Sequence, residues 1–157
     1  MAAGKWKMYE SAKLEWANGG IDFDSHSFKI NLYLSTSNCN TLTAATIDQL
    51  SDLTNQVATN FGYTQNDKAI TITTSNSGGT ITIDGSDVSW TASGGDITAH
   101  FAVIYDDSHV SDMPCFVCYC NYNGGSPANV TATDGGTFNV TINVSGIMTF
   151  AGAASDT

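Results

Sequence analysis

The sequence predicts an all-β protein: a jelly-roll-like antiparallel β-sandwich with a short N-terminal helix and one short internal helix. Beyond Asp67 most segments alternate apolar and polar residues, as half-buried strands do, and Gly, Asn and Asp separate these segments. Seven or eight short strands with such turns indicate a sandwich or a jelly roll. A chain of 157 residues also has the size of one domain, so residues 1–157 are expected to form a single sandwich.

Residues 1–17 are expected to form an N-terminal helix or arm. Aromatic residues recur at helical spacing between Ala3 and Ala17, and Gly19-Gly20 can end the helix in the left-handed conformation. Aromatic side chains on so short a helix make a large apolar face, which either covers the sheet or docks on a neighbouring subunit. The same segment concentrates Lys in an otherwise acidic chain. We therefore hypothesise an assembly interface made of Trp6, Tyr9, Lys13 and Trp16.

The first strand is predicted within Ser27–Ser35, because Phe28, Ile30 and Leu32 alternate with polar residues. The internal helix is expected within Ala44–Thr59, where apolar residues stand at helical spacing, although β-branched residues weaken its helical propensity. Further strands are expected at residues 69–73, 80–83, 115–122, 129–133 and 136–150, with turns at 75–79 and 84–85 and a flexible tail at 151–157.

The stretch from Asp87 to Asp107 is predicted to be a β-hairpin. Val88 and Trp90 alternate with polar residues, Gly94-Gly95 supplies a turn, and a second alternating segment follows up to Tyr105. A hairpin of this length needs a second sheet or a helix over its apolar face. The residues expected in the core are Phe28, Ile30, Leu32, Trp90, Phe101 and Val103.

The charge balance argues against a nucleic-acid partner. The chain has 15 Asp and Glu against 5 Lys and Arg, a formal net charge of −10. Proteins that bind phosphates instead group Lys and Arg on one face. No apolar run approaches the roughly 18 residues of a membrane span, and polar residues interrupt the N-terminal region too often for a signal peptide. We therefore expect synthesis in a cytosol and no membrane partner.

Four cysteines raise the question of a zinc site. Cys115, Cys118 and Cys120 are close in sequence and Cys39 lies far upstream. A Cys-x-x-Cys pair must curl into a knuckle to bind zinc, whereas strand alternation puts Cys118 and Cys120 on one face and Cys115 on the other. We expect buried free thiols that pack as small apolar groups.

Two acidic loops contain the remaining candidates for chemistry. Asp106–Asp112 gathers three carboxylates and an imidazole, which could bind a hard cation or serve an enzyme. Because the spacing matches no EF-hand or metallopeptidase motif, we prefer a solvated turn whose Asp side chains cap backbone groups. Asp22–His26 is interpreted in the same way. No nucleophile motif or phosphate-binding glycine loop is found, so no catalytic residue, metal ligand or cofactor is predicted.

Seven segments between Trp6 and Asp106, about two thirds of the chain, carry a resemblance to known proteins. They are Trp6–Tyr9 (WKMY), Asn18–Asp24 (NGGIDFD), Ser27–Leu32 (SFKINL), Leu53–Val57 (LTNQV), Phe61–Thr64 (FGYT), Asp87–Ala92 (DVSWTA) and Ile97–Asp106 (ITAHFAVIYD). Together they resemble a family of small structural proteins of tailed bacteriophages. The chain departs from the family pattern at Gln56, where Glu is usual, at Gln65-Asn66, where two Gly are usual, and at His100, where a basic residue is frequent.

The resemblance implies a virion component without enzymatic activity. The implied role is a capsid decoration, or cement, protein that binds over the joints between major capsid protein subunits. Such a protein is made in the cytoplasm of a bacterial host, self-associates as a dimer or trimer and ends on the capsid surface. A tail or neck position remains open, and so does a carbohydrate- or receptor-binding sandwich displayed on the virion.

Overall fold

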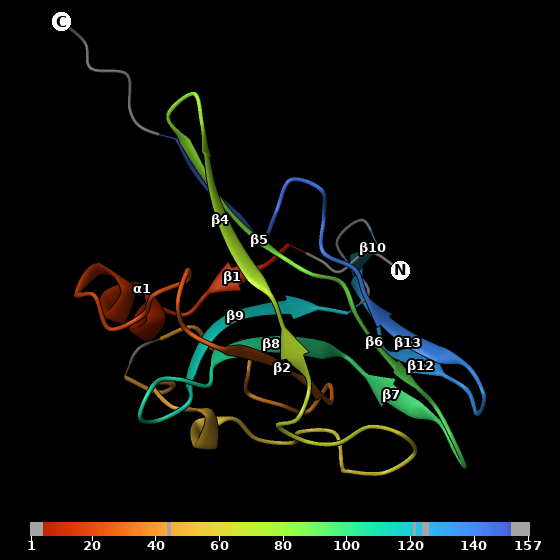
Figure 1. Ribbon diagram of the computed structural model, residues 1–157. Helices are drawn as coiled ribbons and strands as arrows, with labels where there is room; N and C mark the ends of the chain where they lie inside the picture. The colour runs from red at the N-terminus through yellow and green to blue at the C-terminus, as the bar shows by residue number, and fades with distance from the viewer. Residues whose placement is uncertain (1–4, 44, 121, 124–125, 152–157) are drawn as a thin grey trace, which may run out of the picture.

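The computed structural model describes residues 5–43, 45–120, 122–123 and 126–151. Strands make up 41% of the described structure and helical residues 8%, so the predicted all-β class is confirmed (Figure 1). Every strand pair among the described residues is antiparallel. These strands form one five-stranded sheet and several smaller ones, which does not confirm the jelly-roll arrangement.

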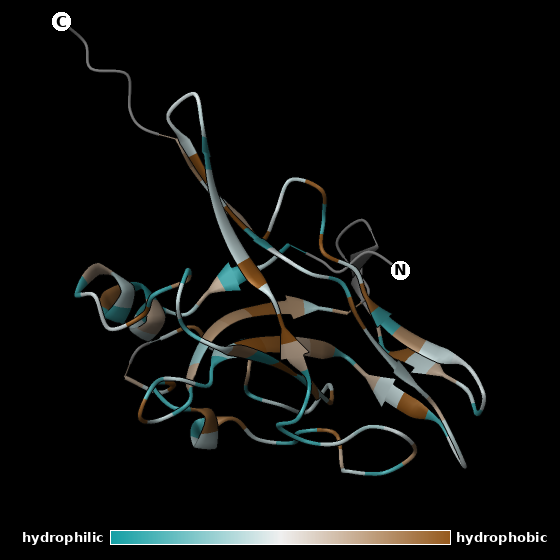
Figure 2. Ribbon diagram, in the orientation of Figure 1, coloured by the Kyte–Doolittle hydropathy of each residue, from teal (hydrophilic) through white to brown (hydrophobic). Residues whose placement is uncertain are grey.

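The five-stranded sheet is the centre of the fold. Its order is β1 (Lys7–Met8), β9 (Met113–Tyr119), β8 (Phe101–Asp106), β2 (Phe28–Tyr33) and β3 (Ala69–Ile70). All six residues of β8 are buried, because this strand lies in the middle of the sheet and both of its faces are covered. In Figure 2 the apolar colouring follows β8 and β9 across the middle of the molecule.

A three-stranded ribbon projects from this centre. It contains β4 (Ile72–Ser77), β5 (Thr80–Gly85) and β14 (Met148–Ala151), with β5 in the middle (Figure 1). The turn between β4 and β5 is Gly78-Gly79, with φ of 57° and 81°, as the tight turns of twisted hairpins require. The predicted turn at 84–85 is wrong, since both residues pair with β4, and most of the turn predicted at 75–79 is strand.

The predicted hairpin over Asp87–Asp107 is also wrong. β6 (Val88–Thr91) pairs with β13 (Thr137–Val140), and β7 (Ile97–Ala99) pairs with β12 (Val130–Ala132). The loop between β6 and β7 binds the loop between β12 and β13. The Gly94 N–H donates to the Asp134 carboxylate at 2.7 Å, and the Asp134 N–H donates to the Asp96 carboxylate at 3.1 Å. A further short pair joins β10 (Tyr122–Asn123) to β11 (Ser126–Pro127).

The N-terminal helix is shorter than predicted. Helix α1 covers Glu10–Ala17, whereas Lys7–Met8 is the extended strand β1, because pairing with β9 satisfies its backbone groups. The Tyr9 N–H continues this pairing by donating to the Cys115 carbonyl at 3.0 Å. Residues 1–4 of the predicted segment lie outside the described residues.

The predicted internal helix within Ala44–Thr59 is wrong. Only a single 3-10 turn, η1 (Leu50–Asp52), is present among its described residues. Polar side chains bind the backbone there in place of helical hydrogen bonds. The Asp52 carboxylate accepts the N–H groups of Asp48 and Gln49, both at 3.1 Å, and the Asn38 side chain donates to the Asp52 carbonyl at 2.9 Å.

The core forms between the central sheet and the segments around it. The buried residues include all six that the sequence analysis assigned to the core: Phe28, Ile30, Leu32, Trp90, Phe101 and Val103. Of the predicted tail, Ala151 ends β14, and residues 152–157 lie outside the described part of the chain. No helix in the described residues is long and apolar enough to cross a membrane.

Candidate functional site

The hypothesised assembly interface is only partly at the surface. Tyr9 is completely buried, and its hydroxyl donates to the Cys39 carbonyl at 2.5 Å. Burial also raises the pKa of the Tyr9 phenol far above its ordinary value. Its ring is therefore part of the core and is not available to a partner, so the assignment of Tyr9 to an interface is wrong.

The other three residues differ in their exposure. Trp6 and Trp16 are partly buried, and the Trp16 ring packs 4.8 Å from the Phe150 ring. Lys13 is exposed. Leu14, which the helical pattern treated only as a flanking residue, is 59% exposed and is the apolar side chain that α1 offers to solvent. The surface of this helix thus combines the Lys13 ammonium group and the Leu14 side chain with the exposed carboxylate of Glu10.

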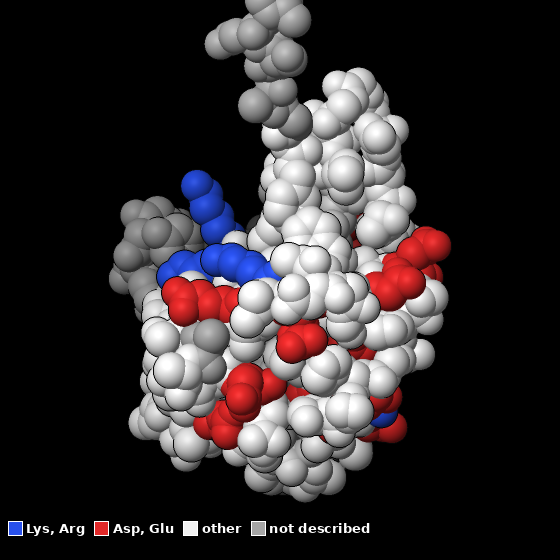
Figure 3. Space-filling model, turned by 90° about the vertical axis from the view of Figure 1, so that its left-hand side faces the viewer, with Lys and Arg blue, Asp and Glu red and all other residues white. Residues whose placement is uncertain are grey.

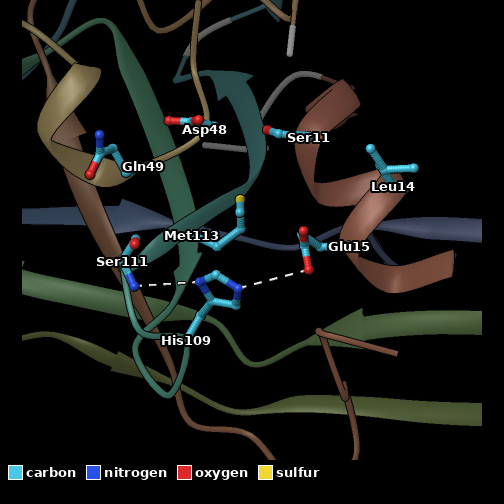
Figure 4. A pocket seen from close by; sticks show the side chains of 8 residues that line it. All are labelled: Ser11, Leu14, Glu15, Asp48, Gln49, His109, Ser111 and Met113. Atoms are coloured by element: carbon cyan, nitrogen blue, oxygen red, sulfur yellow. Dashed lines mark hydrogen bonds and ion pairs between the residues drawn. The ribbon is translucent and has the colours of Figure 1, made fainter. Parts of the chain in front are cut away.

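Beside α1 lies an open pocket of about 370 Å³ (Figure 4). It is lined by α1, by residues 48–49 and by the connection between β8 and β9. His109 Nε2 lies 3.9 Å from Glu15 Oε2, which is longer than a hydrogen bond, and His109 Nδ1 accepts the Ser111 N–H at 3.4 Å. The Ser11 hydroxyl donates to the Ile47 carbonyl at 2.7 Å. The pocket therefore contains an imidazole and carboxylates, but the Ser11 hydroxyl is already used to hold the backbone.

The two acidic loops of the sequence analysis meet in space. Asp106 is completely buried at the end of β8, and its Oδ2 lies 2.5 Å from Nδ1 of His26. Its other oxygen, Oδ1, accepts the Ser108 N–H at 2.9 Å. The Ser27 N–H donates to Ser108 Oγ at 2.8 Å, which joins the loops a second time. The Asp106 end of this loop is thus a buried cross-link and not the solvated turn that we expected.

The other acidic residues of these loops have more local roles. Asp22 caps its own turn by accepting the Asp24 N–H at 2.9 Å and the Ser25 hydroxyl at 2.7 Å. These hydrogen bonds, with that from Ser25 the strongest, hold the pKa of Asp22 below its ordinary value. Asp107 forms an ion pair with Lys29 at 2.9 Å. The contacts of Asp22 and Asp107 therefore hold the loops in place, and neither one joins a nucleophile to a base.

The cysteines are free and buried. Burial raises the pKa of Cys39 to about 12 and that of Cys115 well above its ordinary value, which disfavours the thiolate that a metal requires. The described residues include no group of three or more His, Cys, Asp or Glu side chains arranged to hold a metal ion. The thiols pack as apolar groups in this fold.

Comparisons with known protein families, with curated proteins and with solved structures find no match to this chain.

Several residues on which the sequence analysis based its expectation of a phage structural protein come together in space. The Tyr63 hydroxyl accepts the Leu32 N–H at 3.0 Å and the Gln56 side-chain amide at 3.2 Å. The Tyr63 ring lies 5.8 Å from that of Trp90. A side chain at Gly62 would place its Cβ 2.1 Å from the Thr91 carbonyl oxygen. These positions therefore connect β2, the 56–64 segment and β6.

Gln56 and Asn66, which the sequence analysis named as departures from an expected family pattern, contact each other. The Gln56 amide donates to Asn66 Oδ1 at 3.2 Å, and Asn66 has a φ of 59°. Asn tolerates this left-handed conformation better than most other non-glycine residues. Asn31 also donates to Asn66 Oδ1, at 2.6 Å. Gln56 and Asn66 thus belong to one structural hydrogen-bond network.

Proposed function

We propose that this chain is a non-enzymatic bacteriophage virion structural protein, a decoration protein that binds over the joints between major capsid protein subunits. One observation carries the proposal. The residues through which the chain resembles phage structural proteins, Gly62, Tyr63 and Trp90 among them, are used to hold core elements together. Because these residues stabilise the fold, we expect the protein to act through the surface that the fold presents.

The surface of α1 is our candidate for the capsid contact. Lys13 and Leu14 are adjacent on α1 and exposed, in a chain whose net charge is −10. A basic group beside an aliphatic one suits an acidic and partly apolar partner surface, because complementary charge steers the encounter and apolar contact slows dissociation. Trp6 and Trp16, both partly buried, lie in the same segment and can extend this contact.

The position of the chain in the particle tests the role directly. Cryo-electron microscopy of the phage that encodes it should show many copies spread over the head, each above a joint between capsid subunits. A few copies at the tail or neck would contradict the decoration role and favour a tail protein or a receptor-binding protein. Absence of the chain from purified particles would contradict every virion role.

A binding experiment tests the α1 surface. Purified protein is sedimented with expanded capsids that lack it, and the bound copies are counted. Leu14→Ser and Lys13→Glu should each lower the affinity by at least about tenfold if they lie near the centre of the contact. Val144→Ser is the matched control, because Val144 is 100% exposed in the connection between β13 and β14. Native occupancy by a folded Leu14→Ser, Lys13→Glu double variant would place the contact elsewhere.

A further inference from the structure

The projecting ribbon ends in an edge strand, β4. In the described structure β4 pairs only with β5, and all residues from Thr73 to Ser77 are exposed. The strand contains no charged residue, no Pro and no bulge, which are the usual features that prevent pairing at a sheet edge. The backbone groups of this edge are therefore able to form hydrogen bonds with another strand.

The free edge presents the backbone groups of Thr74 and Asn76. The Ile147 N–H donates to the Ile83 carbonyl at 2.8 Å, so the backbone of Ile83 is turned toward β14. Thr74 lies opposite Ile83 in the β4–β5 pair. In such a pair the backbone groups of opposite residues point either both toward or both away from the partner strand. The N–H and C=O groups of Thr74, and of Asn76 two residues further on, therefore point away from β5.

The outer part of the ribbon carries none of the chain's charge, and Asp84, far from the β4–β5 turn, is the one ionisable residue of its three strands. Residues 69–83 and 135–151 contain no ionisable side chain, although the whole chain has a net charge of −10. Figure 3 shows the outer part of the ribbon in white, rising above a body on which Asp and Glu are spread. Two copies that approached each other body to body would repel, whereas two ribbons can meet with little repulsion. A basic foreign protein would instead be drawn toward the acidic body.

We propose that β4 of one copy pairs antiparallel with β4 of a second copy. Antiparallel pairing of a strand with itself has two-fold symmetry, so the same edge serves both partners. The two three-stranded ribbons would then form one continuous sheet through the dimer. The inference concerns the association of the chain with itself and does not depend on binding to a capsid.

Sedimentation velocity of the purified chain, from micromolar to millimolar concentration, tests the proposal. The native chain should form dimers as the concentration rises. Ser75→Asp would place carboxylates of the two copies near each other, and Asn76→Pro would remove an outward N–H while the inward bonds of β4 are kept. Each variant should weaken the dimer at least about tenfold. Val110→Asp is the control, because it adds the same charge at a residue that is 90% exposed and outside the ribbon.

Hydrogen exchange identifies the edge directly. The amide protons of Thr74 and Asn76 should exchange quickly in dilute solution and become protected as the dimer forms. Circular dichroism and tryptophan fluorescence of both ribbon variants must match the native chain. A native chain that stays monomeric throughout the concentration range would overturn the proposal. Equal dimerisation by the ribbon variants, or equal weakening by Val110→Asp, would also overturn it.

Discussion

Gly62 offers a sharp test of how the 61–64 segment is held against β6. Its φ is 87°, and an added Cβ would lie 2.1 Å from the Thr91 carbonyl oxygen. A hydrogen bond also holds the two segments together here, since the Ser93 N–H donates to the Phe61 carbonyl at 3.1 Å. Gly62→Ala therefore introduces both an unfavourable backbone conformation and a clash with backbone.

The control separates these two costs. Gly94 has a φ of 77°, and a Cβ added there would meet no atom within 4 Å, so Gly94→Ala carries the conformational cost alone, about 1–2 kcal/mol. Gly62→Ala adds about 1–3 kcal/mol for the clash and about 1 kcal/mol for a weakened hydrogen bond. Its free energy of unfolding should thus fall by about 3–6 kcal/mol in total.

Urea unfolding followed by tryptophan fluorescence measures this difference, because Trp90 is only 6% exposed and will report loss of the core. At about 2–4 °C per kcal/mol, the melting temperature of Gly62→Ala should lie roughly 5–15 °C below that of Gly94→Ala. Equal free energies of unfolding for the two variants, within about 0.5 kcal/mol, would refute the close approach of Gly62 to β6.

Further predictions concern the buried tyrosine hydroxyls and the buried thiols. Tyr63→Phe should lower the free energy of unfolding by about 1–3 kcal/mol, because the amides of Leu32 and Gln56 lose their acceptor. Tyr105→Phe should cost little or stabilise, since the buried Tyr105 hydroxyl has no partner among the described residues, and equal losses in both variants would contradict this reasoning. The native thiols, with the pKa of Cys39 raised to about 12, should resist an exchange reagent at pH 8 and react only on unfolding. Rapid labelling of the folded chain would contradict the burial of the thiols. Because a raised pKa favours the folded state only while the thiol is protonated, the free energy of unfolding should decline as the pH rises above about 8.5.

Local alternation in the sequence predicted several strands and the buried face of β6, whereas the one strand expected at 136–150 is two short strands, β13 and β14. Val88 and Trp90 point into the core and the residues between and after them point out, as the pattern indicated. The partner strands were not predictable from that pattern, because Gly94-Gly95 is compatible with a closed hairpin. Bonds from the turn to Asp134, 40 residues away for Gly94, select a different pairing.

Helical spacing was a weaker guide in the Thr- and Asn-rich segment before Tyr63. Leu50 and Leu53 have the right interval, yet the side chains of Asn38 and Asp52 bind the backbone and leave only one 3-10 turn. The contact between His26 and Asp106 also had no local signal, since the two residues are 80 positions apart.

The sequence by itself determined the all-β class and the six predicted core residues, because composition and alternation are local properties. Only the tertiary structure decided that Tyr9 is buried, that Leu14 is exposed and that β4 has a free edge. Exposure and strand pairing depend on what other segments cover, and those segments are distant in the chain. The N-terminal aromatic pattern that suggested a docking surface therefore serves largely to complete the core.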